Sequence, residues 1–216
     1  MERTFVMNAV TPTAPLTRRA TRKIAAHKRL LQIAKAVFVE KGYEEATMRS
    51  IAVACGRSTG LIFGHVGNKE ELFAAVLDAD CKEYVEEMRK AATAEGEVLD
   101  ILTRFFVVDY FRQAEQVQLV RDKLSLWWRN EENTTRHMLN FRNETELLVE
   151  EILERAVSRG ELRSDTQLDL LSEMLWDAYI VEYQNYALSD HDLATQARID
   201  AFRAKATVIL AGSRGS

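Results

Sequence analysis

Proline and cysteine are both scarce in this chain of 216 residues. The two prolines, Pro12 and Pro15, lie near the N-terminus, and none follows them. Since proline interrupts the hydrogen bonds of a helix, so long a stretch without it is typical of an all-α protein. The two cysteines, Cys55 and Cys81, form no CxxC pattern, which argues against a structural zinc site and suits a reducing compartment.

Long apolar segments and targeting signals are also lacking. Runs such as FFVV at 105–108 fall far short of the roughly 18 residues that a membrane-spanning helix needs. The N-terminal residues contain no apolar core followed by a cleavage site, so we expect the protein to stay in the cytoplasm. The histidines are scattered without the spacing of metal ligands. We therefore expect no membrane association, no metal site and no cofactor.

Charge is distributed unevenly along the chain, although the net charge is only −4. Residues 16–70 contain eleven Lys or Arg against four acids, a net charge of +7. Residues 71–216 contain 17 bases against 28 acids, a net charge of −11. A basic segment joined to an acidic one predicts a module that meets an anionic polymer, attached to a module that does not.

Apolar residues at helical spacing, with capping residues and glycines at the boundaries, predict nine helices. Thr47 and Asn68 are suited to N-cap the second and fourth of them, and Gly42 is placed to end the first. The expected helices are 22–41, 48–55, 58–65, one that opens after Asn68 and ends before Gly96, 97–114, 116–129, 132–159, 165–188 and 191–211.

Four of the nine glycines, Gly56, Gly60, Gly64 and Gly67, fall within twelve residues. Such a cluster suits either a loop that cradles a phosphate or a tight turn between helices. The cluster lacks the GxGxxG and GxxxxGK[ST] spacings, and no strand precedes it, as nucleotide-binding loops require. Short helices on either side of the CGRS connection instead predict a helix-turn-helix, with Gly56 in the turn.

Residues 34–73 contain a set of marks at fixed positions, namely Ala36 and Phe38 before KGY at 41–43, Thr47, Ile51, Ala52, Gly56, Ser58, Gly60, His65 and KEELF at 69–73. With these marks the segment resembles the DNA-binding domain of TetR-family transcriptional regulators. Over 97–216 the likeness is limited to the helical character and to the RGEL turn at 159–162.

The resemblance implies a ligand-responsive regulator, foremost a repressor, that binds a palindromic DNA operator as a homodimer. A small molecule, partly apolar or aromatic, would release it from the DNA. The implied organisation is a disordered basic arm over 1–21, a three-helix DNA-binding domain over 22–67, and a helical ligand-binding and dimerisation domain over 68–216. The arm suits two interpretations equally, namely contacts to DNA or a solvated tail.

The resemblance also assigns DNA contacts residue by residue. Thr47 and Lys69 match positions that hold phosphates, and the start of the third helix matches the segment that reaches base edges. Phe63 stands where the family usually has tyrosine, and Gly64 replaces a frequently larger residue, so both reduce contact. The expected DNA-binding residues are Thr47, Arg49, Arg57, Ser58, Thr59, Gly60, Phe63, Gly64, His65 and Lys69.

The acidic half contains the three tryptophans and a row of aromatic residues at helical spacing in 176–186. Aromatic side chains on one helix face line a ligand cavity or fill a core or dimer interface, and the spacing alone does not separate these possibilities. The candidate ligand-binding residues are Phe105, Trp127, Trp128, Phe141, Trp176, Tyr179 and Tyr183.

Two other classes of protein are alternatives to a regulator. An all-helical enzyme would use Glu, His and Tyr for acid–base chemistry, but the sequence contains no ExxH pair, no nucleophile elbow and no Cys/His cluster. We therefore expect no catalytic residues. A helical adaptor that binds protein would lack the steep salt dependence that DNA binding through several Lys and Arg requires.

Overall fold

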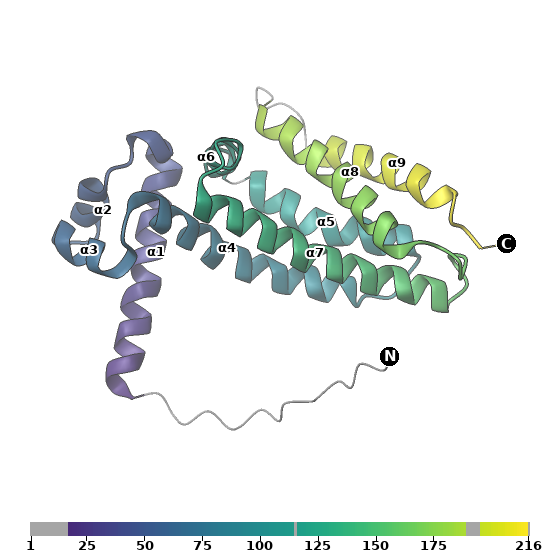
Figure 1. Ribbon diagram of the computed structural model, residues 1–216, viewed down its shortest axis with the longest axis horizontal. Helices are drawn as coiled ribbons and strands as arrows, with labels where there is room; N and C mark the ends of the chain where they lie inside the picture. The colour runs from purple at the N-terminus through teal and green to yellow at the C-terminus, as the bar shows by residue number, and fades with distance from the viewer. Residues whose placement is uncertain (1–16, 115, 189–194, 216) are drawn as a thin grey trace.

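The computed structural model describes residues 17–114, 116–188 and 195–215, and these form nine helices without a sheet (Figure 1). The expected all-α fold is therefore confirmed. No helix among the described residues has the length and apolar character that crossing a membrane requires. The helices are α1 (Arg18–Glu45), α2 (Met48–Ala54), α3 (Thr59–Val66), α4 (Lys69–Ala92), α5 (Val98–Ala114), α6 (Val117–Trp128), α7 (Glu132–Ser158), α8 (Leu168–Leu188) and α9 (Thr195–Ala211).

The first helix begins earlier than the sequence predicts. The Thr17 side chain N-caps α1 by accepting a hydrogen bond from the Ala20 N–H at 3.3 Å. Residues 18–21, expected in a disordered arm, therefore form the first turn of the helix, because a capping threonine precedes them and neither proline nor glycine follows. Residues 1–16 of the expected arm lie outside the described part of the chain.

Other helix boundaries follow the expected ranges to within a few residues. The predicted caps are confirmed: the side chains of Thr47 and Asn68 accept hydrogen bonds from backbone N–H groups in the first turns of α2 and α4. α8 begins at Leu168 rather than at 165, because a turn precedes it. The expected start of the last helix at 191 lies outside the described residues.

Two hydrophobic clusters hold the helices together. The smaller joins α1, α2, α3 and the first turns of α4, around residues such as Phe38 and Phe73. The larger joins α4, α5, α7, α8 and α9, around residues such as Met88 and Phe106. Figure 1 shows α1–α3 at one end of the molecule and the bundle of α5–α9 at the other, with α4 running between them. α6 contributes to both clusters.

Gly42 ends the regular part of α1, as the sequence predicts. Its backbone has φ of 75° and ψ of 164°, a region that only glycine adopts without strain. A short turn over 43–45 continues beyond it, and the Ala46 N–H donates to the Gly42 carbonyl at 3.1 Å.

A substitution at Gly42 tests this requirement. We expect Gly42→Ala to lower the free energy of unfolding by about 1–3 kcal/mol, because alanine is strained in this conformation. The exposed neighbour gives the control: Lys41→Ala should change the same quantity by less than about 0.5 kcal/mol. Urea unfolding followed by circular dichroism measures both, and equal effects would contradict the assignment.

Candidate functional site

The segment from α2 to α3 has the sharp connection of a helix-turn-helix. α2 ends at Ala54 with Cys55 as its C-cap, and Gly56 turns the chain with φ of 62°, which confirms the predicted role of this glycine. The Arg57 N–H donates back to the Ala52 carbonyl at 3.0 Å and closes the end of α2. α3 then begins two residues later, at Thr59.

The start of α2 presents an exposed hydroxyl beside an exposed base. The Thr47 Oγ1 accepts from the Ser50 N–H at 3.0 Å, and the Thr47 N–H donates to the Ser50 Oγ at 3.1 Å, which completes a capping box. A hydroxyl has one donor in addition to its acceptor sites, so the O–H of Thr47 is still able to donate. Arg49 lies exposed in the same turn.

The outer face of α3 is bare of side chains at Gly60 and Gly64, one turn apart. Both glycines are exposed, neither has a positive φ, and a Cβ built on either would meet no atom within 4 Å. Backbone conformation and internal packing therefore do not require glycine at these positions, although each costs the helix about 1 kcal/mol relative to alanine.

Of the other contacts expected at α3 and just before it, two lie on residues whose side chains the structure describes and two do not. Ser58 is exposed, and Thr59 is half-buried at the first turn of the helix. The side chains of Phe63 and His65 lie outside what the structure describes, so their expected contacts stay predictions.

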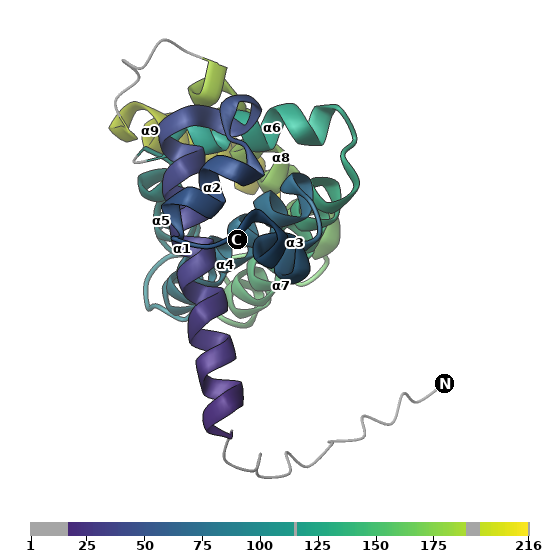
Figure 2. The ribbon, with the colours of Figure 1, turned by 90° about the vertical axis from the view of Figure 1, so that its left-hand side faces the viewer.

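Basic side chains near this face have no acidic partner. Of the bases in residues 17–69 that the structure describes, Lys35 forms an ion pair, with Asp80 of α4. Arg49 and Arg57 form none, whereas bases such as Arg142 and Arg203 in the bundle do. Figure 2 looks onto the end of the molecule where α1–α3 lie.

A groove of about 460 Å³ runs between α1 and the turn after α2. Arg29 and Arg57 line it from opposite sides, together with Cys55 and His27. Burial raises the pKa of the Cys55 thiol, and the charges of the two arginines oppose that shift. Two guanidinium groups thus converge on one groove beside the start of α3.

Lys69 lies at the first turn of α4 and is engaged within the chain. Its Nζ donates to the Tyr43 carbonyl at 2.9 Å and lies 4.2 Å from the centroid of the Tyr43 ring. The expected phosphate contact by Lys69 stays a prediction. In this structure the same ammonium group fixes the segment that follows Gly42.

Most of the expected ligand-binding aromatics pack against other rings, but Trp128 lines a hollow of about 630 Å³ between α6 and α8, and Phe141 borders one of about 340 Å³ between α4 and α7. Five of the seven rings are almost fully buried in the larger cluster and contact other rings at centroid distances of 4.7–6.0 Å. Trp127 packs partly buried against that cluster, and Trp128 is 73% exposed on the surface. The five buried rings are Phe105, Phe141, Trp176, Tyr179 and Tyr183.

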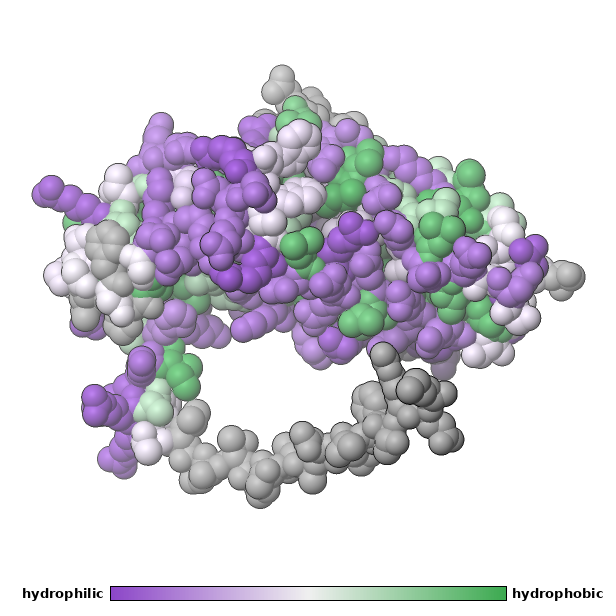
Figure 3. Space-filling model, in the orientation of Figure 1, coloured by the Kyte–Doolittle hydropathy of each residue, from purple (hydrophilic) through white to green (hydrophobic). Residues whose placement is uncertain are grey.

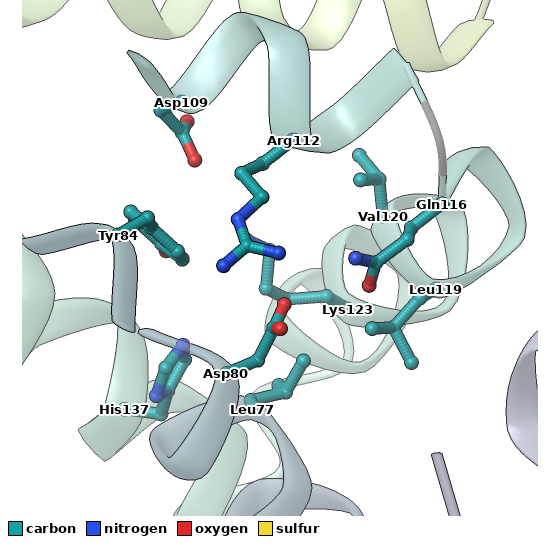
Figure 4. A pocket seen from close by; sticks show the side chains of 10 residues that line it. All are labelled: Leu77, Asp80, Tyr84, Asp109, Arg112, Gln116, Leu119, Val120, Lys123 and His137. Carbon is teal, nitrogen blue, oxygen red and sulfur yellow. The ribbon is translucent and has the colours of Figure 1, made fainter. Parts of the chain in front are cut away.

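A small polar cavity lies beside these rings and is lined by none of the seven (Figure 4). Its volume is about 30 Å³, room for about two water molecules. Four buried or half-buried charged side chains reach it from three helices, namely Asp80 of α4, Asp109 and Arg112 of α5 and Lys123 of α6. Asp80 also carries the ion pair with Lys35, so one wall of the cavity is tied directly to α1.

His137 of α7 also lines the cavity. Its Nδ1 lies 2.6 Å from the Asp78 Oδ1, outside the cavity. Burial lowers the pKa of His137, and the bond to Asp78 opposes this without reversing it. The imidazole is therefore neutral near pH 7.

Sequence reasoning missed these cavity residues. Two signals were available: Asp109 is the only charged residue in the apolar run FFVVDYF at 105–111, and Lys123 lies on the apolar stripe of α6 with Leu119 and Val120. A charge inside an apolar stripe is the mark of a buried functional group or of an ion pair. Neither signal predicts that α4, α5, α6 and α7 meet at this cavity.

Comparison with known proteins now decides the family. Residues 30–76 match the family described as bacterial regulatory proteins, tetR family. The chain carries the DNA-binding domain of the TetR family. It is therefore a DNA-binding transcriptional regulator, and the matched residues include α2, the turn and α3.

Proteins that are similar over most of the chain are also named as transcriptional repressors or regulators. The HTH-type transcriptional repressor AcnR of Corynebacterium glutamicum is 29% identical over 146 residues, which are 68% of this chain and 73% of the repressor. The fatty acid degradation regulator FadR from Bacillus halodurans has a TM-score of 0.70 at 20% identity, covering 87% of this chain and 100% of that one. FadR from Bacillus subtilis, solved in complex with stearoyl-CoA, has a TM-score of 0.69 at 14% identity, covering 86% and 98%. The TetR-family fold thus extends over the helices of the bundle as well.

Proposed function

We propose that this TetR-family regulator is a cytoplasmic repressor that binds a roughly palindromic operator as a homodimer and leaves it when a small molecule binds among α4, α5, α6 and α7. The observation that carries the DNA-binding surface is the bare outer face of α3. A helix that approaches the edges of bases closely in the major groove gains from glycines at Gly60 and Gly64, which nothing inside the chain requires.

The surrounding residues would divide the remaining contacts. The Thr47 hydroxyl and Arg49, at the exposed start of α2, would hold phosphates, and Ser58 and Thr59 at the start of α3 would face base edges. The groove between Arg29 and Arg57 is suited to a phosphate of the same strand, because its two guanidinium groups have no carboxylate partner among the described residues. Arg29 is an addition to the residues that the sequence suggests.

A second copy of the chain would pack on the outer faces of α8 and α9. Large apolar side chains are exposed there although the two helices pack together, namely Met174 and Val181 on α8 and Val208, 76% exposed, on α9. Small residues at Ala197 and Ala204 allow a second helix to approach α9 closely. Figure 3 shows apolar patches on the surface over the bundle. Four helices paired across a two-fold axis would cover such a face.

The coupling between ligand and DNA would run through α4 and α1. The pair between Lys35 and Asp80 joins a cavity wall to the helix that supports α2 and α3. A ligand that changes the position of Asp80 would therefore change the position of α1. Stearoyl-CoA, the ligand of the Bacillus subtilis FadR structure, is far larger than a cavity of about 30 Å³. A guest held in this cavity must therefore be much smaller than stearoyl-CoA.

The test of DNA binding is retardation of the DNA upstream of the protein's own gene, measured over a range of salt concentrations. Affinity should fall steeply with salt, and Arg57→Ala should either reduce the slope of log K against log salt by about 1 or cost about 1–3 kcal/mol with altered base preference. Arg136→Ala on α7, half-exposed and paired with Glu132, is the control and should change neither quantity. Unretarded DNA would contradict the proposal, and an unchanged slope and affinity in Arg57→Ala would contradict the role of that residue.

Gly64→Ala separates a contact surface from a purely structural glycine. The new methyl group meets no atom of the chain, so the free energy of unfolding should rise by about 0.5–1 kcal/mol. Operator affinity should fall at the same time, because the methyl group stands on the face that approaches the bases. Gly212→Ala, which also has open space around its Cβ but follows α9, should leave operator affinity unchanged. Full affinity in Gly64→Ala would place the DNA elsewhere.

The dimer surface is tested with a charge at Val208. Val208→Asp should convert the dimer to monomers in sedimentation velocity and weaken binding to a palindromic operator, because the aspartate would be desolvated without a partner. Leu147→Asp on α7, where leucine is 62% exposed, should leave the dimer intact. A Val208→Asp protein that sediments as the wild type would show that the copies meet on another face.

A further inference from the structure

Two cationic side chains line the polar cavity of Figure 4, and they differ in how easily a guest can pair with them. Lys123 is 7% exposed, and its Nζ lies 4.8 Å from the centroid of the Tyr183 ring. Burial alone would lower the pKa of Lys123, but the charges of Tyr183 and Asp109 raise it above its ordinary value. The ammonium group therefore stays charged near neutral pH in the wall of the cavity.

Arg112 is the second cation, and its partner is easily replaced. Its guanidinium group extends into the middle of the cavity (Figure 4) and pairs with Glu83 at 3.3 Å. The Glu83 side chain is 60% exposed, so solvent screens the pair, and such pairs contribute little to stability. An oxyanion held away from water would be a stronger partner for the same guanidinium group.

Both carboxylates of the cavity are already engaged. Asp80 forms the ion pair with Lys35, and Asp109 accepts a hydrogen bond from the Tyr179 hydroxyl and lies close enough to Lys123 to raise its pKa. A cationic guest would have to displace one of these buried bonds. An anionic guest has to displace only Glu83 at the rim.

Size and apolar lining limit the guest further. With Arg112 in its present position the volume is about 30 Å³, so a guest larger than water must widen the cavity by shifting that side chain. The part of the wall that is not polar consists of Leu77, Leu119 and Val120. These side chains suit a short hydrocarbon body rather than a sugar or a nucleotide.

We propose that this cavity is the effector site and that it takes a small carboxylate with a short apolar body, which replaces Glu83 as the partner of Arg112 and places its charge between Arg112 and Lys123. The inference rests on the proposed function, since it names the class of effector of the regulator. Gln116 lies at the same wall, and its buried Oε1 accepts no hydrogen bond from the protein.

Isothermal titration calorimetry on the full chain tests the proposal with butyrate, benzoate and succinate, their neutral amides butyramide and benzamide, and inorganic phosphate. At least one carboxylate should bind, and its amide should bind at least tenfold more weakly, because the amide offers no charge to Arg112. Phosphate binding tighter than every carboxylate would overturn the proposal in favour of an inorganic oxyanion. Absence of binding by all three carboxylates would overturn it as well.

Three variants separate the site from a merely structural ion pair. Arg112→Gln should weaken carboxylate binding by roughly 10- to 100-fold, and Arg112→Lys should restore part of it. Glu83→Gln should bind the carboxylate about two- to fivefold more tightly, because it removes the competing partner. Arg89→Gln is the matched control, since Arg89 also pairs with a half-exposed glutamate, Glu144, away from the cavity, and it should bind as the wild type. An unchanged affinity in Glu83→Gln would contradict the exchange of partners.

Retardation of operator DNA without any added ligand tests the proposed function separately. DNA binding without carboxylate binding would overturn the effector class and leave the regulator intact. Carboxylate binding that leaves DNA retardation unchanged would overturn the cavity as an effector site. Thermal melting of each variant by circular dichroism shows that a lost affinity is not a loss of fold.

Discussion

One uninterrupted helix, α4, is shared by both hydrophobic clusters, and the rest of the structure depends on this sharing. Its first turns place Leu72 and Phe73 among α1–α3, and its later turns place Tyr84 and Met88 in the bundle. A helix bends little over its length because each turn is held by its own hydrogen bonds. The two clusters therefore cannot shift independently, and a displacement of α4 in the bundle is carried to the base of the helix-turn-helix.

Directional polar contacts supplement the shared helix at the junction. The Tyr43 N–H, just after Gly42, donates to Asp122 of α6 at 2.7 Å. Glu70 at the start of α4 accepts hydrogen bonds from the backbone N–H and the hydroxyl of Thr134, in the first turn of α7. A carboxylate at a helix N-terminus is favoured by the partial positive charge there. Hydrophobic contacts tolerate sliding, but these bonds hold only in one arrangement, so they fix the register between the two clusters.

Features set by neighbouring residues were predictable from the sequence, and features set by packing were not. The caps at Thr47 and Asn68, the turn at Gly56 and the end of regular helix at Gly42 each follow from local backbone chemistry, and each is confirmed. The aromatic residues of α8 illustrate the limit, because a stripe of rings at helical spacing has the same pattern whether it surrounds a cavity or fills a core. Their mutual ring contacts, which depend on α5 and α7 as well, decide for a core.

The cavity is one place where the bundle departs from ordinary core chemistry. Burying a charged side chain costs free energy even when it is paired, and apolar residues of similar volume often stabilise a core as well or better. Asp109 and Lys123 are 2% and 7% exposed, yet they lie beside a cluster of rings that shows how well this fold packs apolar groups. Packing alone therefore gives no reason to retain them, and local conflicts of this kind concentrate at functional sites. The proposed guest, which pairs with the cations of the cavity, supplies a reason to retain them. The ion pair between Asp80 and Lys35 connects the wall of the cavity directly to α1.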